Sequence, residues 1–236
     1  MLDQLTALHR YQDEFLATIA LVEPSVRVES CGDWRVADLV EHLAEIHHWA
    51  AAKASCGPET PLEPEPAELA ARYARYATEL RDTLAGLDPD ARAWTLADQG
   101  LPAEQQTGTV RFWHRRQALE TLVHLWDLRT AAGLGFDPGV EAWLDCLDEV
   151  VTVMHPRQVR LGRIGPPVAR VRFGADETGQ VWELTGADAA APLVTISGPA
   201  AALALLAWGR VAPDHATLTV TGDRDLLGRA LAGLTP

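Results

Sequence analysis

The sequence predicts an α+β protein, in which a helical bundle of about 155 residues precedes a small domain of mixed strands and helices. Two observations carry this prediction. Apolar residues recur every three or four positions through the first two thirds of the chain, which is typical of amphipathic helices. After His155 and Pro156 the pattern changes to short runs in which apolar and polar residues alternate, as in half-buried strands. We therefore expect domains at 1–155 and 156–236.

Helices in the first domain are expected to end where proline or glycine interrupts the apolar pattern. Their expected ranges are 2–21, 34–53, 67–87, 110–132 and 138–154. Asp33 is a good N-cap for the second of these helices. The stretch 88–108 mixes Pro, Gly, Asp and Gln, and predicts a long connection of the kind that often has a function.

The second domain alternates between strand and helix patterns. Pro199 suits the start of one helix, because proline is tolerated in a first helical turn. Asp223 can cap another. The expected strands are 168–173, 180–184, 193–196 and 216–221, and the expected helices are 200–208 and 224–233.

Composition excludes several classes of partner. The formal net charge is -13, so no basic face is available to neutralise nucleic-acid phosphates. No apolar run reaches the length of about eighteen residues that a membrane span needs. The N-terminus lacks the basic and apolar regions of a signal peptide, and the three cysteines have unrelated spacings. We expect a cytoplasmic protein that binds neither nucleic acid nor membrane.

The most informative pattern lies in the 110–132 helix. Glu120 and His124 are four residues apart, so both side chains project from one helix face. A buried carboxylate and imidazole need a partner, and a divalent metal ion is an economical one. His42 lies within the apolar stripe of the 34–53 helix and is the natural third ligand. Two imidazoles and a carboxylate suit a catalytic divalent site, typically zinc, with an open position.

The same residues have a simpler interpretation, because any helix-rich chain with eight histidines can show this spacing by chance. In that alternative, a hydrogen-bonded core histidine lies beside a surface salt bridge. His47 and His48 are expected to point away from His42. The side chains expected to orient or balance the ligands, rather than to bind the ion, are Asp38, Glu45, Arg116 and Asp127.

Three stretches together resemble the mycothiol-dependent maleylpyruvate isomerase family. They are Trp34 to Leu43, with the pattern W-x-x-x-D-L-x-x-H-L, then Arg116 to Asp127, and Val194 to Arg210. The resemblance covers nearly the whole chain in the same order. It implies an actinobacterial protein with a DinB-like, up-down four-helix metal-binding domain and a sterol-carrier-like α+β domain.

The resemblance also implies roles for individual residues. The zinc ligands of the family fall on His42, Glu120 and His124. An arginine of the C-terminal domain is expected to hold an anionic substrate, and Arg210 is our candidate, since a guanidinium binds a carboxylate bidentately. The alternative for Arg210 is a solvent-facing charge at a helix end.

The implied function uses zinc and mycothiol. A thiol at the open position of the metal loses its proton and adds to a small electrophilic substrate of the maleylpyruvate kind, for isomerisation or S-transfer. Two alternatives remain open: a metal-dependent hydrolase with water as the nucleophile, and a non-catalytic protein that holds a metal and a small ligand. A fourth protein ligand, such as Asp38 or Glu45, would favour the latter. We expect a monomer or a homodimer.

Overall fold

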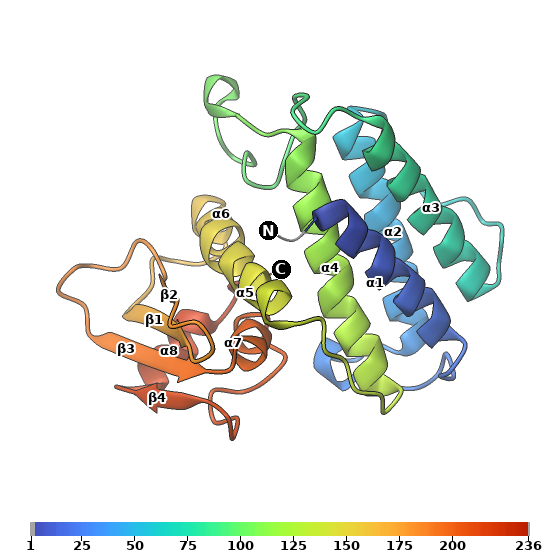
Figure 1. Cartoon of the computed structure of the whole chain (residues 1–236). Helices are drawn as coiled ribbons and strands as arrows, with labels where there is room; N and C mark the ends of the chain where they lie inside the picture. Colours follow the sequence, from blue (N-terminus) through green and yellow to red (C-terminus); the bar gives the residue numbers. More distant parts are fainter. Residues whose placement is uncertain (1–2, 236) are drawn as a thin grey trace. The chain divides into compact units, whose positions relative to one another are not determined.

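A computed structural model gives the fold of the protein and describes residues 3–235. The chain divides into two compact units, Met1–Asp137 and Pro138–Pro236, each of which is described here by itself (Figure 1). The first unit is helical and the second combines a sheet with helices, which confirms the predicted α+β class. The predicted division at 155 differs from this boundary, because the helix after Pro138 packs against another helix of the second unit.

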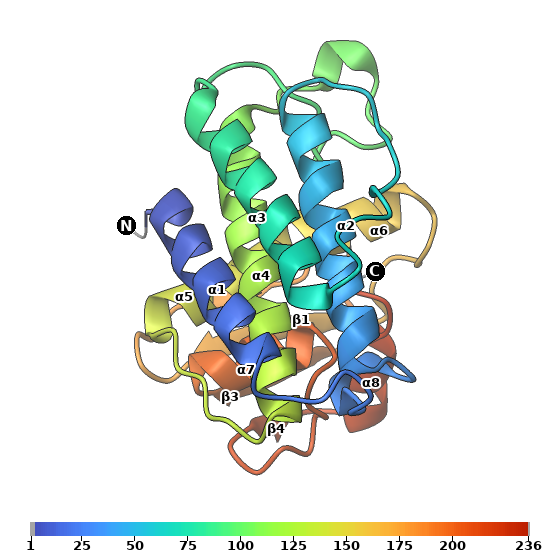
Figure 2. The same ribbon diagram turned by 90° about the vertical axis from the view of Figure 1, so that its right-hand side faces the viewer.

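Four long helices form the first unit, and they lie side by side in Figure 2. In the core of the bundle, α1 packs on α4 and α2 packs on α3, and α2 also contacts α4. Leucine and aromatic side chains such as Leu39, Leu80 and Trp113 are fully buried. The helices are α1 (Gln4–Ile19), α2 (Val36–Ala54), α3 (Leu69–Gly86) and α4 (Val110–Ala131), within about two residues of the predicted ranges.

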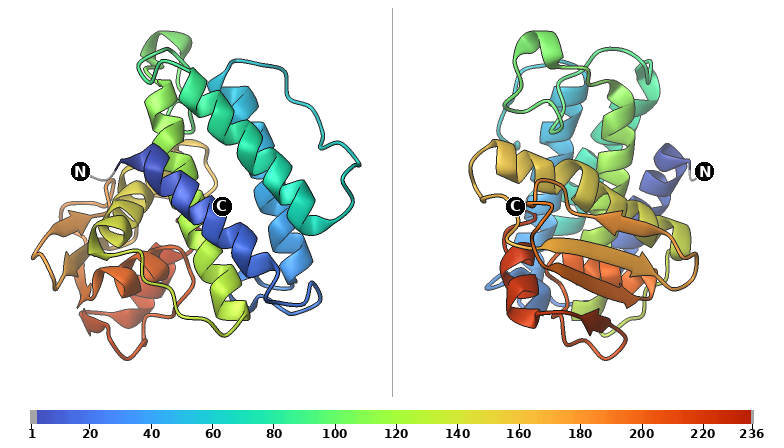
Figure 3. Two further views of the ribbon diagram at one scale, coloured as in Figure 1. Left: turned by 45° about the vertical axis from the view of Figure 1, so that its right-hand side comes forward. Right: turned by 90° about the vertical axis from the view of Figure 1, so that its left-hand side faces the viewer.

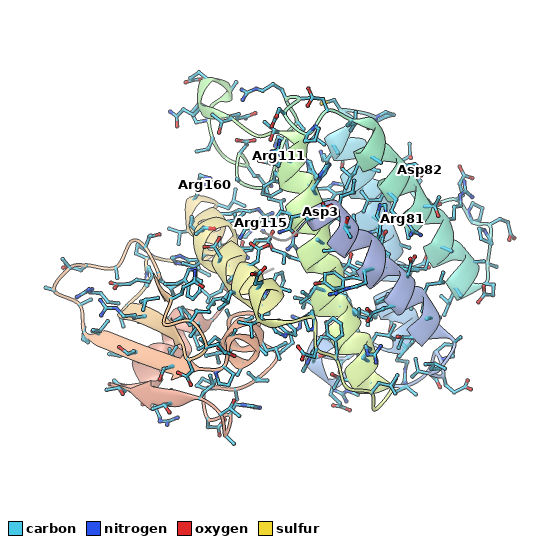
Figure 4. The ribbon with its side chains drawn as sticks, viewed as in Figure 1. Asp3, Arg81, Asp82, Arg111, Arg115 and Arg160 are labelled. Atoms are coloured by element: carbon cyan, nitrogen blue, oxygen red, sulfur yellow. The ribbon has the colours of Figure 1, made fainter. Side chains whose placement is uncertain are left out.

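Polar contacts set the ends and spacing of these helices (Figure 4). Asp3 caps α1, where its Oδ1 accepts hydrogen bonds from the backbone N–H groups of Leu5 and Thr6 at 3.2 and 3.4 Å. Arg81 of α3 donates to Asp13 of α1 at 2.8 Å. That ion pair joins α1 and α3.

The prediction that Asp33 caps α2 is wrong. The helix begins at Val36, its N-cap is Arg35, and the Arg35 N–H donates to the Asp38 carboxylate at 2.8 Å. Asp33 is exposed and lies 3.6 Å from Arg27. The start is displaced because residues 26–36 form a compact loop closed by backbone hydrogen bonds, so the chain enters the helix two residues later.

A single carboxylate organises the long connection between α3 and α4, which contains a short 3-10 helix, Ala103–Gln105. Asp98 is 3% exposed and accepts hydrogen bonds from the N–H groups of Thr107 and Gly108 and from the Thr95 hydroxyl, at 2.9, 3.1 and 2.8 Å. A Cβ on Gly108 would lie 2.2 Å from Asp98 Oδ2. The loop therefore has no space for a side chain at Gly108.

The second unit holds a four-stranded sheet with the order β2-β1-β3-β4 (Figure 3). The central strands β1 and β3 are parallel, and each edge strand is antiparallel to its neighbour. The helices α7 and α8 pack on the sheet, and α5 packs on α7. The strands are β1 (Arg170–Ala175), β2 (Val181–Glu183), β3 (Leu193–Gly198) and β4 (Thr219–Thr221). The helices are α5 (Val140–Glu149), α6 (His155–Arg160), α7 (Ala200–Ala207) and α8 (Arg224–Leu231), with a π-helical turn, Val150–Met154, between α5 and α6.

Within residues 3–235, no helix combines the length and the apolar character that a bilayer crossing requires.

Candidate metal centre

The packing of α2 against α4 brings His42, Glu120 and His124 together. Glu120 Oε1 lies 3.7 Å from His42 Nε2 and 3.4 Å from His124 Nε2, and all three ligand atoms lie within 4.8 Å of one another. Helical periodicity places Glu120 and His124 on one face of α4, and His42 approaches from the facing helix.

These distances fit a metal ion. Ligand atoms bonded at about 2.0–2.1 Å around a tetrahedral zinc ion are about 3.3–3.4 Å apart. The two separations from Glu120 are close to that value and longer than ordinary hydrogen bonds between nitrogen and oxygen. Nitrogen and carboxylate oxygen are also donors that zinc accepts. The residues present therefore fit a divalent ion of this kind.

The three side chains of the cluster differ in burial. Glu120 and His124 are each 6% exposed, whereas 28% of the His42 side chain is exposed. His42 is therefore the most exposed of the three side chains.

Arg116 stabilises the charge of Glu120. One turn before Glu120 on α4, its Nη2 donates to Glu120 Oε2, and both side chains are buried. Burial alone would raise the pKa of Glu120, but Arg116 and the two imidazoles hold that pKa well below its ordinary value. Glu120 is therefore a carboxylate, with Oε1 turned toward the histidines.

Asp127 orients His124. The Nδ1 atom of His124 lies 3.0 Å from Asp127 Oδ2, and Asp127 has no exposed surface. Burial alone would lower the pKa of His124, but Asp127, Cys31 and Glu120 raise it well above the ordinary value. With Nδ1 bonded to a carboxylate, Nε2 is the nitrogen that faces the cluster.

Trp34 is a neighbour of the cluster that the sequence did not identify as a site residue. Its ring centroid lies 4.8 Å from that of His42 and 6.5 Å from that of His124. Trp34 is the first residue of the W-x-x-x-D-L-x-x-H-L pattern, and its place in that pattern is the sequence signal that could have identified it. Its side chain forms an aromatic wall beside both imidazoles.

Asp38 and Glu45 lie outside the ligand set, and Arg210 belongs to the second unit. Asp38 is exposed and caps α2, and Glu45 is exposed on α2. Neither belongs to the His42, Glu120 and His124 cluster. Arg210 follows α7 in the second unit, where its Nη1 donates to the Trp208 carbonyl at 2.9 Å.

Comparison with known proteins identifies relatives for both units. Residues 5–129 match the family model of the mycothiol maleylpyruvate isomerase N-terminal domain, and residues 139–229 match the MDMPI C-terminal domain. Uncharacterised proteins from two strains of Mycobacterium tuberculosis are each 27% identical over 168 residues, which is 66% of this chain and 82% of the relative.

Two solved structures share the fold. One is a crystal structure of the mycothiol-dependent maleylpyruvate isomerase, with 16% identity and a TM-score of 0.62. The other is a crystal structure of a mutant of that enzyme, with 15% identity and a TM-score of 0.66. Each match covers 92% of this chain and 91% of the solved one. With more than half of its length matched by the N-terminal family model alone, the chain belongs to the mycothiol-dependent maleylpyruvate isomerase family.

Proposed function

We propose that the protein is a zinc-dependent enzyme that uses mycothiol as cofactor or co-substrate and acts on a small electrophilic acid such as maleylpyruvate. The observation that carries the proposal is the cluster of His42, Glu120 and His124 in a member of this family. A zinc ion bound there would lower the pKa of a thiol at its open position, so that the thiolate is available as a nucleophile.

The chain's own residues prepare that chemistry. Three side chains would hold the ion, Arg116 keeps Glu120 ionised, and Asp127 fixes the orientation of His124. The half-buried indole of Trp34 limits access of water on one side. Because these charged and polar groups are already in place, they need not reorient during the reaction.

The reaction itself takes place between the thiolate and the substrate. As the sulfur–carbon bond forms, the π electrons of the substrate's conjugated double bond move toward its carbonyl group. Rotation about the resulting single bond, followed by loss of the thiolate, restores the double bond in the other configuration. In a transferase, the adduct would instead take up a proton and be released.

The number of ligands favours catalysis over a structural role. Structural zinc sites are normally closed by four protein ligands, whereas catalytic sites keep a position open. Among the described residues, this cluster comprises three side chains, and neither candidate for a fourth ligand, Asp38 or Glu45, is part of it.

Arg210 is proposed to bind a carboxylate of the substrate. A planar guanidinium matches a carboxylate with two parallel hydrogen bonds, and a lysine ammonium does not. We expect Arg210→Lys to raise KM for an anionic substrate about tenfold, with metal content unchanged. A KM equal to that of the wild type would remove Arg210 from the proposal.

The metal content of the purified full-length protein tests the site. We expect about one zinc ion per chain in the wild type and loss of zinc in His42→Ala. His215→Ala is the matched control, because His215 is exposed and bonded within its own loop to Thr217. Equal zinc in the wild type and His42→Ala would defeat the proposal.

The thiol requirement tests the reaction. We expect turnover of maleylpyruvate and related unsaturated acids with mycothiol, and none when the thiol is omitted. Turnover that continues without the thiol would overturn its role, and a hydrolysed product would instead indicate a metal-dependent hydrolase, in which water is the nucleophile.

We also propose a cytoplasmic location and a monomeric or homodimeric state. The chain has three cysteines at unrelated spacings, which do not suit the disulfide framework of a secreted protein. Light scattering of the purified protein measures the mass of the particle, and a trimer or larger assembly would contradict the second part.

A further inference from the structure

A short turn before α2 presents two hydrogen-bond donors to Asp127. In this 3-10 turn, Glu29–Cys31, the Ser30 hydroxyl donates to Asp127 Oδ1 at 2.6 Å, and the Cys31 thiol donates to Asp127 Oδ2 at 3.4 Å. Asp127 lies on α4 and is fully buried. A segment far away in the sequence therefore holds the carboxylate that orients His124.

The two oxygens of Asp127 have different partners. Ser30 occupies Oδ1, whereas His124 and Cys31 share Oδ2. A hydroxyl on Oδ1 restricts rotation of the carboxylate, so that Oδ2 stays directed at the imidazole. Because Asp127 is buried, each of these bonds acts where water cannot replace it.

Backbone hydrogen bonds hold the turn in place. Backbone hydrogen bonds join Val28 to Trp34 and Val36 to Val26, both at 2.9 Å. Gly32 closes the turn with a φ of +66°, and its carbonyl accepts a hydrogen bond from Arg27 at 3.0 Å. The position of the Ser30 hydroxyl is thus fixed by the backbone.

Cys31 lies close enough to His124 and Asp127 to suggest a second metal cluster, since one ligand atom from each falls within 4.8 Å. The hydrogen bonds favour a different role. His124 Nδ1 and the Cys31 thiol both lie within bonding distance of the same oxygen, Asp127 Oδ2. In this arrangement the Cys31 thiol serves Asp127 as a hydrogen-bond donor.

We propose that Ser30 is a positioning residue of the metal centre, which acts through Asp127 to hold His124 Nε2 toward the ion. Cys31 supports the same carboxylate as a weaker donor. The inference rests on the proposed function, because it assumes that His42, Glu120 and His124 bind a metal.

The test is a titration of the metal-free full-length protein with Co²⁺ and Zn²⁺ in the presence of a competing chelator. We expect Ser30→Ala to weaken the affinity for both ions about tenfold, at the lower end of the effect of residues that orient ligands. The visible absorption bands of bound Co²⁺ should also shift, because the imidazole is less firmly held. Cys31→Ala should weaken affinity less.

Two further variants separate the hydroxyl from its volume. Ser30→Thr keeps a hydroxyl and should bind cobalt like the wild type. Valine has nearly the shape of threonine but no hydroxyl, so Ser30→Val should behave like Ser30→Ala. This pair remains informative if Ser30→Ala does not fold. Ser55→Ala is the control, since its hydroxyl donates to the Ala51 carbonyl at 2.8 Å near the end of α2.

The outcomes are distinguishable. If the wild-type protein binds neither ion, the proposed function fails. If the wild type binds and the threonine and valine variants have equal affinities and equal cobalt spectra, the role of Ser30 is overturned.

Discussion

His47 of α2 and Gln117 of α4 form a buried pair, in which His47 Nδ1 lies 3.0 Å from Gln117 Oε1. His47 has no exposed surface, and burial lowers its pKa from 6.5 to about 4. The imidazole of His47 is therefore neutral in the folded protein at neutral pH. The next residue, His48, has a carboxylate partner instead, since its Nδ1 lies 2.8 Å from Glu79 Oε2.

The first prediction is that His47 makes the fold sensitive to acid. Between pH 6.5 and about 4 the unfolded chain takes up a proton at His47 that the folded chain does not, so the free energy of unfolding falls as the pH falls. From pH 7 to pH 5 the loss is about 2 kcal/mol. In His47→Gln this part of the loss should disappear.

Urea unfolding at both pH values, with a chelator present, measures this difference. His215→Gln, at an exposed histidine, should keep the wild-type dependence on pH. If the loss of stability between pH 7 and pH 5 were the same in His47→Gln as in the wild type, the neutral buried state would be contradicted.

The second prediction concerns Gly108. A Cβ there would lie 2.2 Å from Asp98 Oδ2 and 2.6 Å from the Ala93 carbonyl oxygen, so the loop before α4 must open. We expect Gly108→Ala to reduce the free energy of unfolding by about 2 kcal/mol or more. In Gly86→Ala, where the added Cβ meets nothing within 4 Å, stability should stay equal or rise by up to about 1 kcal/mol. Equal thermal unfolding of the two variants would contradict the tight closure.

The third prediction uses Trp34 as a reporter of the metal. Because its ring lies beside both histidines, Co²⁺ bound at the cluster should quench its fluorescence. The quenching on titration should be markedly smaller in Trp34→Phe. Trp94→Phe removes a tryptophan of the separate cluster with Trp49 and Trp113, and should leave most of the quenching. If Trp94→Phe lost more of the quenching than Trp34→Phe, the ion would bind elsewhere.

The fourth prediction compares two tyrosines of α3. The Tyr76 hydroxyl accepts a hydrogen bond from the Glu63 N–H at 2.6 Å and so ties down the proline-rich loop before α3. The buried Tyr73 hydroxyl has no hydrogen-bond partner among the described residues. We expect Tyr76→Phe to cost about 1 kcal/mol of stability and to speed proteolytic cleavage within 55–66, and Tyr73→Phe to be neutral or stabilising. Faster cleavage in the Tyr73 variant would contradict this assignment.

Helical periodicity explains why much of the site could be predicted. The spacing of Glu120 and His124 fixes a common face in any α-helix, and the apolar stripe of α2 fixes the inward direction of His42. The structure brings these three side chains together, although metal binding itself stays a prediction. The ranges of the four long helices could be predicted for the same reason, because the buried face of each helix appears in the sequence as a periodic apolar pattern.

Contacts that depend on loops could not be predicted in this way. The positions of Ser30 and Trp34 follow from the closure of a turn by backbone hydrogen bonds, which has no periodic signal. His47 is expected to point away from His42, but the sequence does not show that Gln117 of another helix is its buried partner. The amphipathic pattern of α5 showed that one face is buried, but not which helix covers it.

The placement of the ligands on two helices also bears on how the protein unfolds. An ion shared by His42 of α2 and by Glu120 and His124 of α4 is a cross-link between chain segments that are far apart in the sequence. Separation of these two helices would then require the loss of at least one metal bond. Zinc should therefore slow unfolding and lengthen the lifetime of the native state, whether or not substrate and thiol are present.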